Sequence, residues 1–257
     1  MAEKLLSLIE RQRDWHTLSK DEIYKSFYKT GNADLDEYLE GGLPLGRFIH
    51  IYGPAGVGKS QFCMQLAANM WKQEKVRLCC FFYCSNASFS SSRYLQICSE
   101  FNIEKDKDEL LSNVFVAEYS SVDDVVNTLN SLTASEMDIG FVCVEGLFDF
   151  TEQDVAGKHF AFTKALGIAL LSISELKKCL TIFVNQVRAA FHINQTSDVT
   201  PALGPNFYFH ALLRMFMDFQ SDERSVRKIE LQRWSLSQKD PFLFTLTKHG
   251  IQAFHQK

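Results

Sequence analysis

The sequence contains no apolar run long enough to cross a membrane, no Cys-x-x-Cys pair and no grouping of cysteine and histidine at zinc-binding spacing. These absences argue against a membrane-embedded protein and against a zinc or dithiol redox site. Proline is also scarce, with five residues in 257, whereas 46% of the residues are hydrophobic and 22 are phenylalanine. This composition favours one large, well-filled α/β domain, alone or with a short appendage. We expect an intracellular, soluble protein.

Excess charge of either sign is also lacking, since the net charge is −4 and the sequence pI is about 6.0. This balance argues against a protein that binds nucleic acid over its whole surface by neutralising phosphates, so any such contact must be local. One small cluster of basic residues, the basic concentration of this chain, is either a local nucleic-acid contact or an ordinary solvated face. It comprises Arg224, Arg227, Lys228 and Arg233.

The seven cysteines are odd in number and lie mostly within apolar stretches. Small core residues in a reducing compartment show this pattern, whereas a disulfide framework pairs its cysteines. We therefore expect buried thiols at Cys63, Cys79, Cys80, Cys84, Cys98, Cys143 and Cys179.

The most informative stretch is Gly-Pro-Ala-Gly-Val-Gly-Lys-Ser at residues 53–60. It follows the apolar run 48–52 and opens a helical pattern, which is the order of a phosphate-binding loop between a strand and a helix. In such a loop the N–H groups turn inward around phosphate oxygens, Lys59 reaches the terminal phosphates, and the Ser60 hydroxyl holds magnesium. The predicted cofactors are ATP and Mg²⁺. The predicted binding residues are Gly53, Pro54, Ala55, Gly56, Val57, Gly58, Lys59 and Ser60.

Strands and helices alternate along most of the remaining chain, which indicates parallel βαβ units. The helix after the loop can bury one face, formed by Cys63, Leu66, Ala67 and Met70. Apolar patterns predict further strands at 76–84, 113–119, 139–144 and 180–184. Further helices are predicted at 90–101, 122–133 and 153–178, with Ser90 and Ser121 as N-caps of the first two.

The two ends of the chain have a different character. The segments 207–219, 226–234 and 242–247 read as strands without intervening helices, which predicts an antiparallel extension at the sheet edge. Residues 30–47 are rich in loop signals. Residues 3–13 form an amphipathic helix candidate that packs on its own domain or docks against a partner subunit; its apolar face carries Leu5, Leu8 and Ile9.

Three elements resemble the RecA-type recombinase family. Residues 30–46 resemble its T-G-x-x-x-L-D-x-x-L-x-G-G-[IL]-x-x-G signature, and Asn185-Gln186-Val187 resembles its N-Q-V element. The segment after its second DNA-binding loop is matched by Pro205, Asn206, His210 and Arg214. The resemblance covers about residues 22–257. It implies a RecA-like P-loop ATPase core at 30–257, with a mostly parallel central sheet flanked by helices, and a short N-terminal helical segment or linker at 1–29.

The chain departs from the filament-forming members of that family. About 25 residues precede the core, too few for their N-terminal helical DNA-binding domain. A match to their F-x-x-A polymerisation element, Phe162-Thr163-Lys164-Ala165, falls inside a predicted core helix and reads as coincidence. The chain therefore resembles a divergent eukaryotic recombinase paralogue, which implies a nuclear location.

The resemblance also implies roles for three residues near the phosphates. Asn86 stands at the position of the family's catalytic acid, and a shift of register to Ser85 or Ser88 would supply no better base. Glu145 stands where the family has a magnesium-binding aspartate, and is either a metal ligand or an ordinary strand-end carboxylate. Gln186 is either a sensor of the γ-phosphate or a polar residue that ends a strand.

Two loops, 147–158 and 188–206, fall where the family contacts DNA. The second is long and polar, and either contacts DNA through backbone phosphates or is simply mobile. Its candidate contact residues are Arg188, His192 and Asn194.

An intact phosphate cradle without a catalytic acid predicts secure ATP binding with at most weak DNA-dependent hydrolysis. The leading hypothesis is a recombination mediator that remodels or stabilises a recombinase filament on single-stranded DNA. A second paralogue or a small subunit is the other expected partner. Two alternatives remain: an autonomous DNA-dependent ATPase with strand-exchange activity, and a nucleotide-independent scaffold in a paralogue complex.

Overall fold

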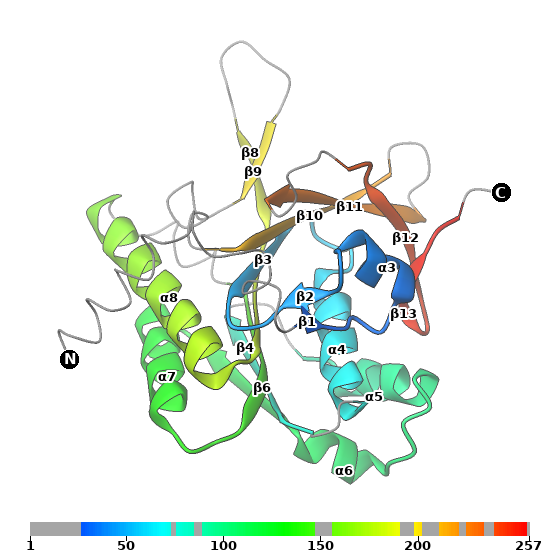
Figure 1. The fold of residues 1–257 in the computed structure, drawn as a ribbon. Helices are drawn as coiled ribbons and strands as arrows, with labels where there is room; N and C mark the ends of the chain where they lie inside the picture. Colours follow the sequence, from blue (N-terminus) through cyan, green and yellow to red (C-terminus); the bar gives the residue numbers. More distant parts are fainter. Residues whose placement is uncertain are drawn as a thin grey trace.

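The computed structural model describes residues 27–72, 76–84, 89–146, 156–190, 198–201, 211–220, 225–233 and 239–255. Most of its strands belong to one large sheet, seen edge-on at the centre of Figure 1. These strands are β3 (Phe48–Tyr52), β4 (Leu78–Cys84), β5 (Val114–Tyr119), β6 (Ile139–Glu145), β7 (Leu180–Asn185), β10 (Leu213–Phe219), β11 (Val226–Arg233), β12 (Phe242–Thr247) and β13 (Gly250–Ala253). Their order in the sheet is β13-β12-β11-β10-β3-β7-β6-β4-β5.

The sheet has a parallel part and an antiparallel part. The strands β3, β7, β6, β4 and β5 are parallel to their neighbours, and β11, β12 and β13 form the expected antiparallel extension. The RecA-like α/β architecture predicted from the sequence is thus present. One detail differs, because β10 runs parallel to β3 and the change of direction comes one strand later than expected.

Helices cover both faces of the sheet (Figure 1). On one face lie α7 (Val122–Ala134) and α8 (Ala156–Lys177), and on the other lie α4 (Lys59–Asn69) and α5 (Ser91–Glu100). The predicted N-caps are found, since the Ser90 and Ser121 hydroxyls accept hydrogen bonds from Arg93 N and Asp124 N at 3.3 and 3.2 Å. Phe162–Ala165, the stretch that matches the F-x-x-A pattern, lies within α8.

Residues 30–47 are more ordered than their loop signals suggest. They contain the short helix α3 (Ala33–Tyr38) and the strand β2 (Leu43–Pro44), which pairs with β1 (Phe27–Tyr28). The Asn32 side chain caps α3 by accepting a hydrogen bond from Leu35 N at 3.0 Å, and Leu35 is fully buried. A further helix that the pattern did not indicate, α6 (Lys107–Ser112), begins at the N-cap Asp106.

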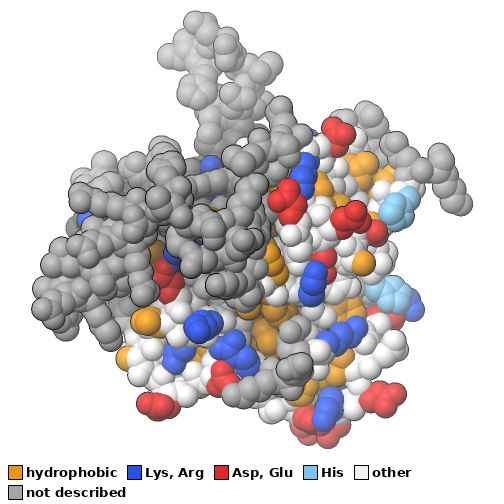
Figure 2. All heavy atoms as spheres, viewed as in Figure 1, with side chains coloured by type: hydrophobic (Ala, Val, Ile, Leu, Met, Phe, Trp, Pro, Cys, Tyr) orange, Lys and Arg blue, Asp and Glu red, His pale blue; other side chains and the backbone are white. Residues whose placement is uncertain are grey.

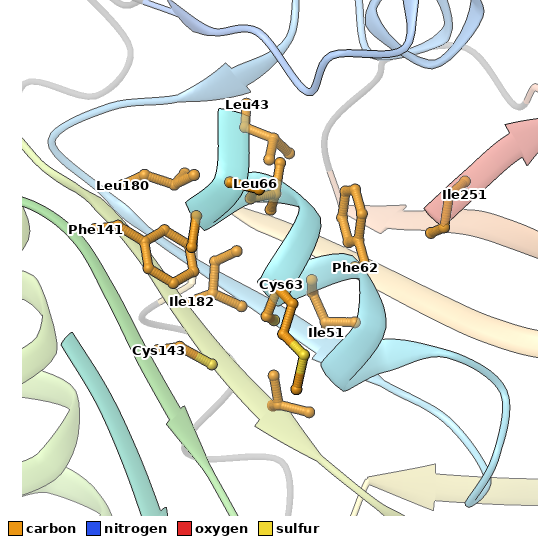
Figure 3. Packing of buried hydrophobic residues seen from close by; sticks show 14 of the residues in the cluster. Leu43, Ile51, Phe62, Cys63, Leu66, Phe141, Cys143, Leu180, Ile182 and Ile251 are labelled. Atoms are coloured by element: carbon orange, nitrogen blue, oxygen red, sulfur yellow. The ribbon is translucent and has the colours of Figure 1, made fainter. Parts of the chain in front are cut away.

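The helix α4 is buried more completely than its apolar spacing predicts. Every residue from Phe62 to Asn69 is buried, because the sheet, including its edge strand β13, covers one side of the helix and α5 packs against another. Figure 3 shows Phe62 on the side facing Ile251 of β13, and Leu66 on the side facing Leu180. The four residues of the predicted buried face, Cys63, Leu66, Ala67 and Met70, are all buried, and the burial extends to the residues between them.

All seven cysteines are free and buried, as their apolar surroundings predicted. No helix in the described part of the chain is long and apolar enough to span a membrane.

The predicted DNA loop at 188–206 is not simply a loop. Its two ends form the antiparallel pair β8 (Val187–Ala190) and β9 (Asp198–Pro201), which projects from the body of the molecule (Figure 1). The predicted helix at 3–13 lies outside the described residues.

Candidate nucleotide-binding site

Four parallel strands of the sheet end side by side. In the strand register Tyr52 of β3 lies beside Asn185 of β7, and Glu145 of β6 lies between Val184 of β7 and Tyr83 of β4. Ligands of open α/β sheets bind at such carboxyl ends. The loop 53–60 follows β3 directly, so the fold brings it to the same edge as Glu145 and Gln186, which are far from it in sequence.

The loop needs glycine for two different reasons. At Gly56 and Gly58 the backbone has φ angles of 77° and 111°, a region that side chains disfavour. At Gly53 the reason is space, because a Cβ atom there would lie 2.0 Å from the carbonyl oxygen of Met217 on β10. The loop is therefore packed directly on the sheet. Leu246 of β12 closes its other side, at 2.8 Å from a Cβ built on Gly58.

Lys59 lies inside the loop rather than in solvent. Its side chain is 6% exposed, and Nζ donates hydrogen bonds to the carbonyl oxygens of Gly53 and Pro54, both at 2.8 Å. Burial lowers the pKa of Lys59, and the nearby Glu145 acts against that shift. The ammonium is thus held at the mouth of a ring of backbone groups, where phosphate oxygens could replace the carbonyl acceptors.

Ser60 and Glu145 meet although 85 positions separate them. The Ser60 hydroxyl donates to Glu145 Oε1 at 2.6 Å, while Glu145 Oε2 is buried without a hydrogen-bond partner among the described residues. Burial raises the pKa of Glu145, whereas Ser60 and Lys59 favour its charged form. A hydroxyl beside a carboxylate with one open oxygen is a hard oxygen donor set of the kind that Mg²⁺ prefers. These residues therefore fit a magnesium ion with bound phosphates.

Gln186 directly follows β7 at the same edge. It is half-buried, and its backbone N–H donates to Asn185 Oδ1 at 2.8 Å. The next residue, Val187, begins β8, so Gln186 connects the central sheet to the projecting pair β8–β9. The position suits a residue that links the nucleotide site to this pair, and the sensor role itself stays a prediction.

The remaining predicted site residues are less informative. Asn86, His192 and Asn194 lie outside the described residues, and Arg188 is described only as part of the β8 backbone. The loop 147–158 lies outside the described residues up to position 155, after which α8 begins.

The predicted basic concentration does not form a free positive face in the described part of the chain. Lys228 Nζ lies 2.6 Å from Glu230 Oε1, and the Arg227 guanidinium lies over the Phe219 ring at 5.6 Å. Arg224 lies outside the described residues, and Arg233 is described only as part of the β11 backbone. On the described part of the face in Figure 2, acidic side chains are interspersed with the basic ones. This distribution agrees with the small net charge.

One contact network near the site was missed by sequence reasoning. Arg93 of α5 donates to Gln61 Oε1 at the start of α4, and to the carbonyl oxygens of Thr247 and Lys248 at 2.7 and 3.2 Å. It therefore joins the first turn of α4 to the turn between β12 and β13. An arginine within a helical pattern gives no sequence signal for such a role, because its partners come from distant elements.

A comparison with protein-family models matches residues 25–253 to the Rad51 family. The chain belongs to the Rad51 family. Among individual relatives of this Rad51-family chain, the DNA repair and recombination protein RadB of Methanococcus maripaludis is 24% identical, over 86% of the chain and 98% of the relative. Protein RecA of Delftia acidovorans is 28% identical over 72% of the chain and 50% of the relative.

A shorter match of higher identity is to the DNA repair protein rhp57 of Schizosaccharomyces pombe. The two sequences are 48% identical over 48 residues, which are 19% of the chain and 14% of that relative. Among solved structures, the crystal structure of the RadB recombinase superposes with a TM-score of 0.72 and 20% identity, over 89% of the chain and all of the RadB chain. The structural match confirms the RecA-like fold of this Rad51-family protein.

Proposed function

We propose that this chain is an ATP-binding accessory factor of homologous recombination that acts in DNA repair as a mediator on recombinase filaments. The general role is supported by relatives whose names refer to DNA repair and recombination. The mediator role depends on one combination of features. The phosphate loop and the Ser60–Glu145 pair are complete, while Asn86 stands where the family carries its catalytic acid.

The site is suited to holding a nucleotide. Lys59 and the N–H groups of the loop would contact the phosphates, and the α4 N-terminus would add a partial positive charge there. Ser60 and Glu145 would hold the magnesium ion, which when bound neutralises charge on the phosphate oxygens.

Hydrolysis needs a group that takes a proton from the attacking water. The amide of Asn86 can orient a water molecule but cannot accept its proton. A general base contributes roughly 10²–10⁴-fold to the rate of such reactions, so we expect tight binding with slow turnover. The protein would then act through its nucleotide-bound state. A ligand that favours one conformation of a loop increases the population of that conformation without being consumed.

The expected partners follow from this mode of action. Gln186 links the site to β8–β9 and to the segment that carries Arg188, His192 and Asn194, which would contact single-stranded DNA through its phosphates. The protein partner would be a recombinase filament, with a second paralogue or small subunit beside it, and the place of action would be the nucleus.

A filament assay tests this proposal. The cognate recombinase is assembled on labelled single-stranded DNA with ATP, and filament formation and lifetime are measured with and without the purified chain. Wild type should change either quantity and Lys59→Ala should not, because it loses the ammonium that holds the phosphates. Lys164→Ala, at an exposed position of α8, is the matched control. A wild-type chain that leaves assembly and lifetime unchanged would contradict the mediator role.

The same preparation separates the alternatives. Homologous pairing by the chain alone, with DNA-dependent hydrolysis that Lys59→Ala abolishes, would establish an autonomous recombinase. A filament effect that is identical in wild type and Lys59→Ala would favour a nucleotide-independent scaffold.

A further inference from the structure

Tyr83, the sixth residue of β4, carries a buried hydroxyl for which the described part of the chain supplies no hydrogen-bond partner. The residue is 1% exposed, and its Oη atom has no hydrogen-bond partner among the described residues. Buried hydroxyl groups are nearly always hydrogen-bonded, so such an exception calls for a physical explanation.

Other buried tyrosines of the chain behave differently. The Tyr28 hydroxyl donates to the carbonyl oxygen of Leu66 at 2.6 Å, and the Tyr94 hydroxyl accepts a hydrogen bond from Trp71 Nε1 at 3.1 Å. The core therefore supplies partners for buried phenols elsewhere. At Tyr83 it supplies aromatic and thiol neighbours, with the Phe81 ring stacked at 6.1 Å.

The position of Tyr83 places it beside the proposed nucleotide site. It is the register partner of Glu145 on the adjacent strand, and register partners project from the same face of a sheet. That face is the one covered by α4, since Tyr83 belongs to the same core cluster as Cys143 of β6 and Cys63 of α4. Figure 3 shows Cys63 and Cys143 entering the space between α4 and the sheet.

The electrostatic surroundings keep the hydroxyl protonated. Burial, reinforced by the nearby Cys143 and Glu145, raises the pKa of Tyr83. The group is therefore a neutral O–H donor at any physiological pH. Glu145 Oε2, on the adjoining strand, is also buried without a partner among the described residues.

We propose that Tyr83 is a further residue of the nucleotide site, whose hydroxyl donates a hydrogen bond to an oxygen of the bound magnesium nucleotide. Tyr83 Oη and Glu145 Oε2, two polar atoms on adjacent strands without partners among the described residues, are explained together if an oxygen-rich ligand bound beside Ser60 and Glu145 supplies a partner to both. The inference rests on the proposed nucleotide binding and adds to it a group that lies outside the phosphate loop.

The test compares Tyr83→Phe with Tyr94→Phe, which removes an equally buried hydroxyl that has a protein partner. Two quantities are measured on each purified variant: the urea midpoint of the nucleotide-free protein, and the Kd for Mg-ATP by titration calorimetry. For Tyr83→Phe we expect an unchanged or higher urea midpoint, because an unsatisfied hydroxyl is lost, and an affinity about tenfold weaker. For Tyr94→Phe we expect a lower midpoint and an unchanged Kd.

Three outcomes would overturn the inference. The first is a Tyr83→Phe variant that binds Mg-ATP as tightly as wild type. The second is a fall in its nucleotide-free midpoint as large as that of Tyr94→Phe, because the hydroxyl would then serve an internal bond. Both leave the proposed function intact. The third, a wild-type protein that does not bind Mg-ATP, contradicts the proposed nucleotide site as well.

Discussion

His50 lies in the middle of β3 and has no exposed surface. Its ring stacks on Tyr52 at 5.1 Å and lies 5.7 Å from Phe183, so it occupies an aromatic layer under α8. Burial, together with the positive charge of Arg214, lowers the pKa of His50 from 6.5 to about 3. The native state therefore keeps this imidazole neutral at pH values where the unfolded chain protonates it.

The sign of the resulting pH dependence follows directly. Between about pH 6.5 and 3 the unfolded state binds a proton that native His50 does not, so stability falls as the pH is lowered. From pH 8 to pH 5 this one group should reduce the free energy of unfolding by about 2 kcal/mol. Urea unfolding at both pH values measures the change, and His50→Phe should show a loss smaller by that amount. An equal loss in both proteins would mean that His50 titrates normally.

Gly53 and Gly56 offer a second test within one loop. A Cβ at Gly53 would meet the Met217 carbonyl oxygen at 2.0 Å, whereas one at Gly56 finds only the Phe219 ring at 4.0 Å. Gly53→Ala must displace the backbone of β10, which we expect to cost about 3 kcal/mol. Gly56→Ala should cost about 1 kcal/mol, from its positive φ alone. Chemical denaturation of the two variants checks the order, and a reversed order would refute this account of the loop.

At the scale of elements, sequence reasoning worked where the signal is local. The order of strand, loop and helix around residues 53–60, the caps Ser90 and Ser121, and the buried strands were predictable because each is set by a few neighbouring residues. The helix α3 was missed, since its only strong signal is the cap Asn32 within a run of loop residues. The complete burial of α4 was missed because β13 comes from the far end of the chain.

The residues of the candidate site also fall into those that local sequence patterns indicate and those that they do not. Glu145 and Gln186 could be placed from sequence because they end apolar strands, and parallel strands end at a common edge. Tyr83 and Arg93 could not, because strand register sets the position of Tyr83 beside Glu145 and helix packing brings Arg93 to the β12–β13 turn. No spacing rule within the chain carries that information.

The contact between α4 and β13 can be tested at one side chain. Gln65 is 1% exposed, and its Oε1 accepts a hydrogen bond from Ile251 N at 2.7 Å. Gln65→Met keeps the length of the side chain and leaves that N–H buried without an acceptor, which should cost about 1–3 kcal/mol. Thermal or urea unfolding measures the loss. The control Asn130→Met, at an exposed position of α7, should change stability by less than about 0.5 kcal/mol. Comparable effects at both positions would contradict a structural role for the Gln65 bond.

At the scale of the whole molecule, the phosphate loop is where the parallel core and the C-terminal extension meet. Glu145 of β6 reaches it through Ser60, Met217 of β10 lies against Gly53, and Leu246 of β12 lies against Gly58. Arg93 strengthens the junction by holding the β12–β13 turn. A ligand in the loop would therefore stabilise both parts of the sheet at once, whereas α7 and β5 lie at the opposite side.

Hydrogen exchange should show this arrangement. A ligand at 100 times its Kd stabilises a native protein by about 2.7 kcal/mol, which slows exchange through global unfolding by about 100-fold. Amides of β12 and β13 that exchange through local opening should slow with Mg-ATP, because that opening would separate Leu246 from Gly58 of the loop and Thr247 from Arg93. Locally exchanging amides of α7 should not respond, and Lys59→Ala should abolish both effects. Mass spectrometry of the exchanged peptides measures each segment, and equal slowing of local exchange in α7 and in β12–β13 would contradict a site closed by the C-terminal extension.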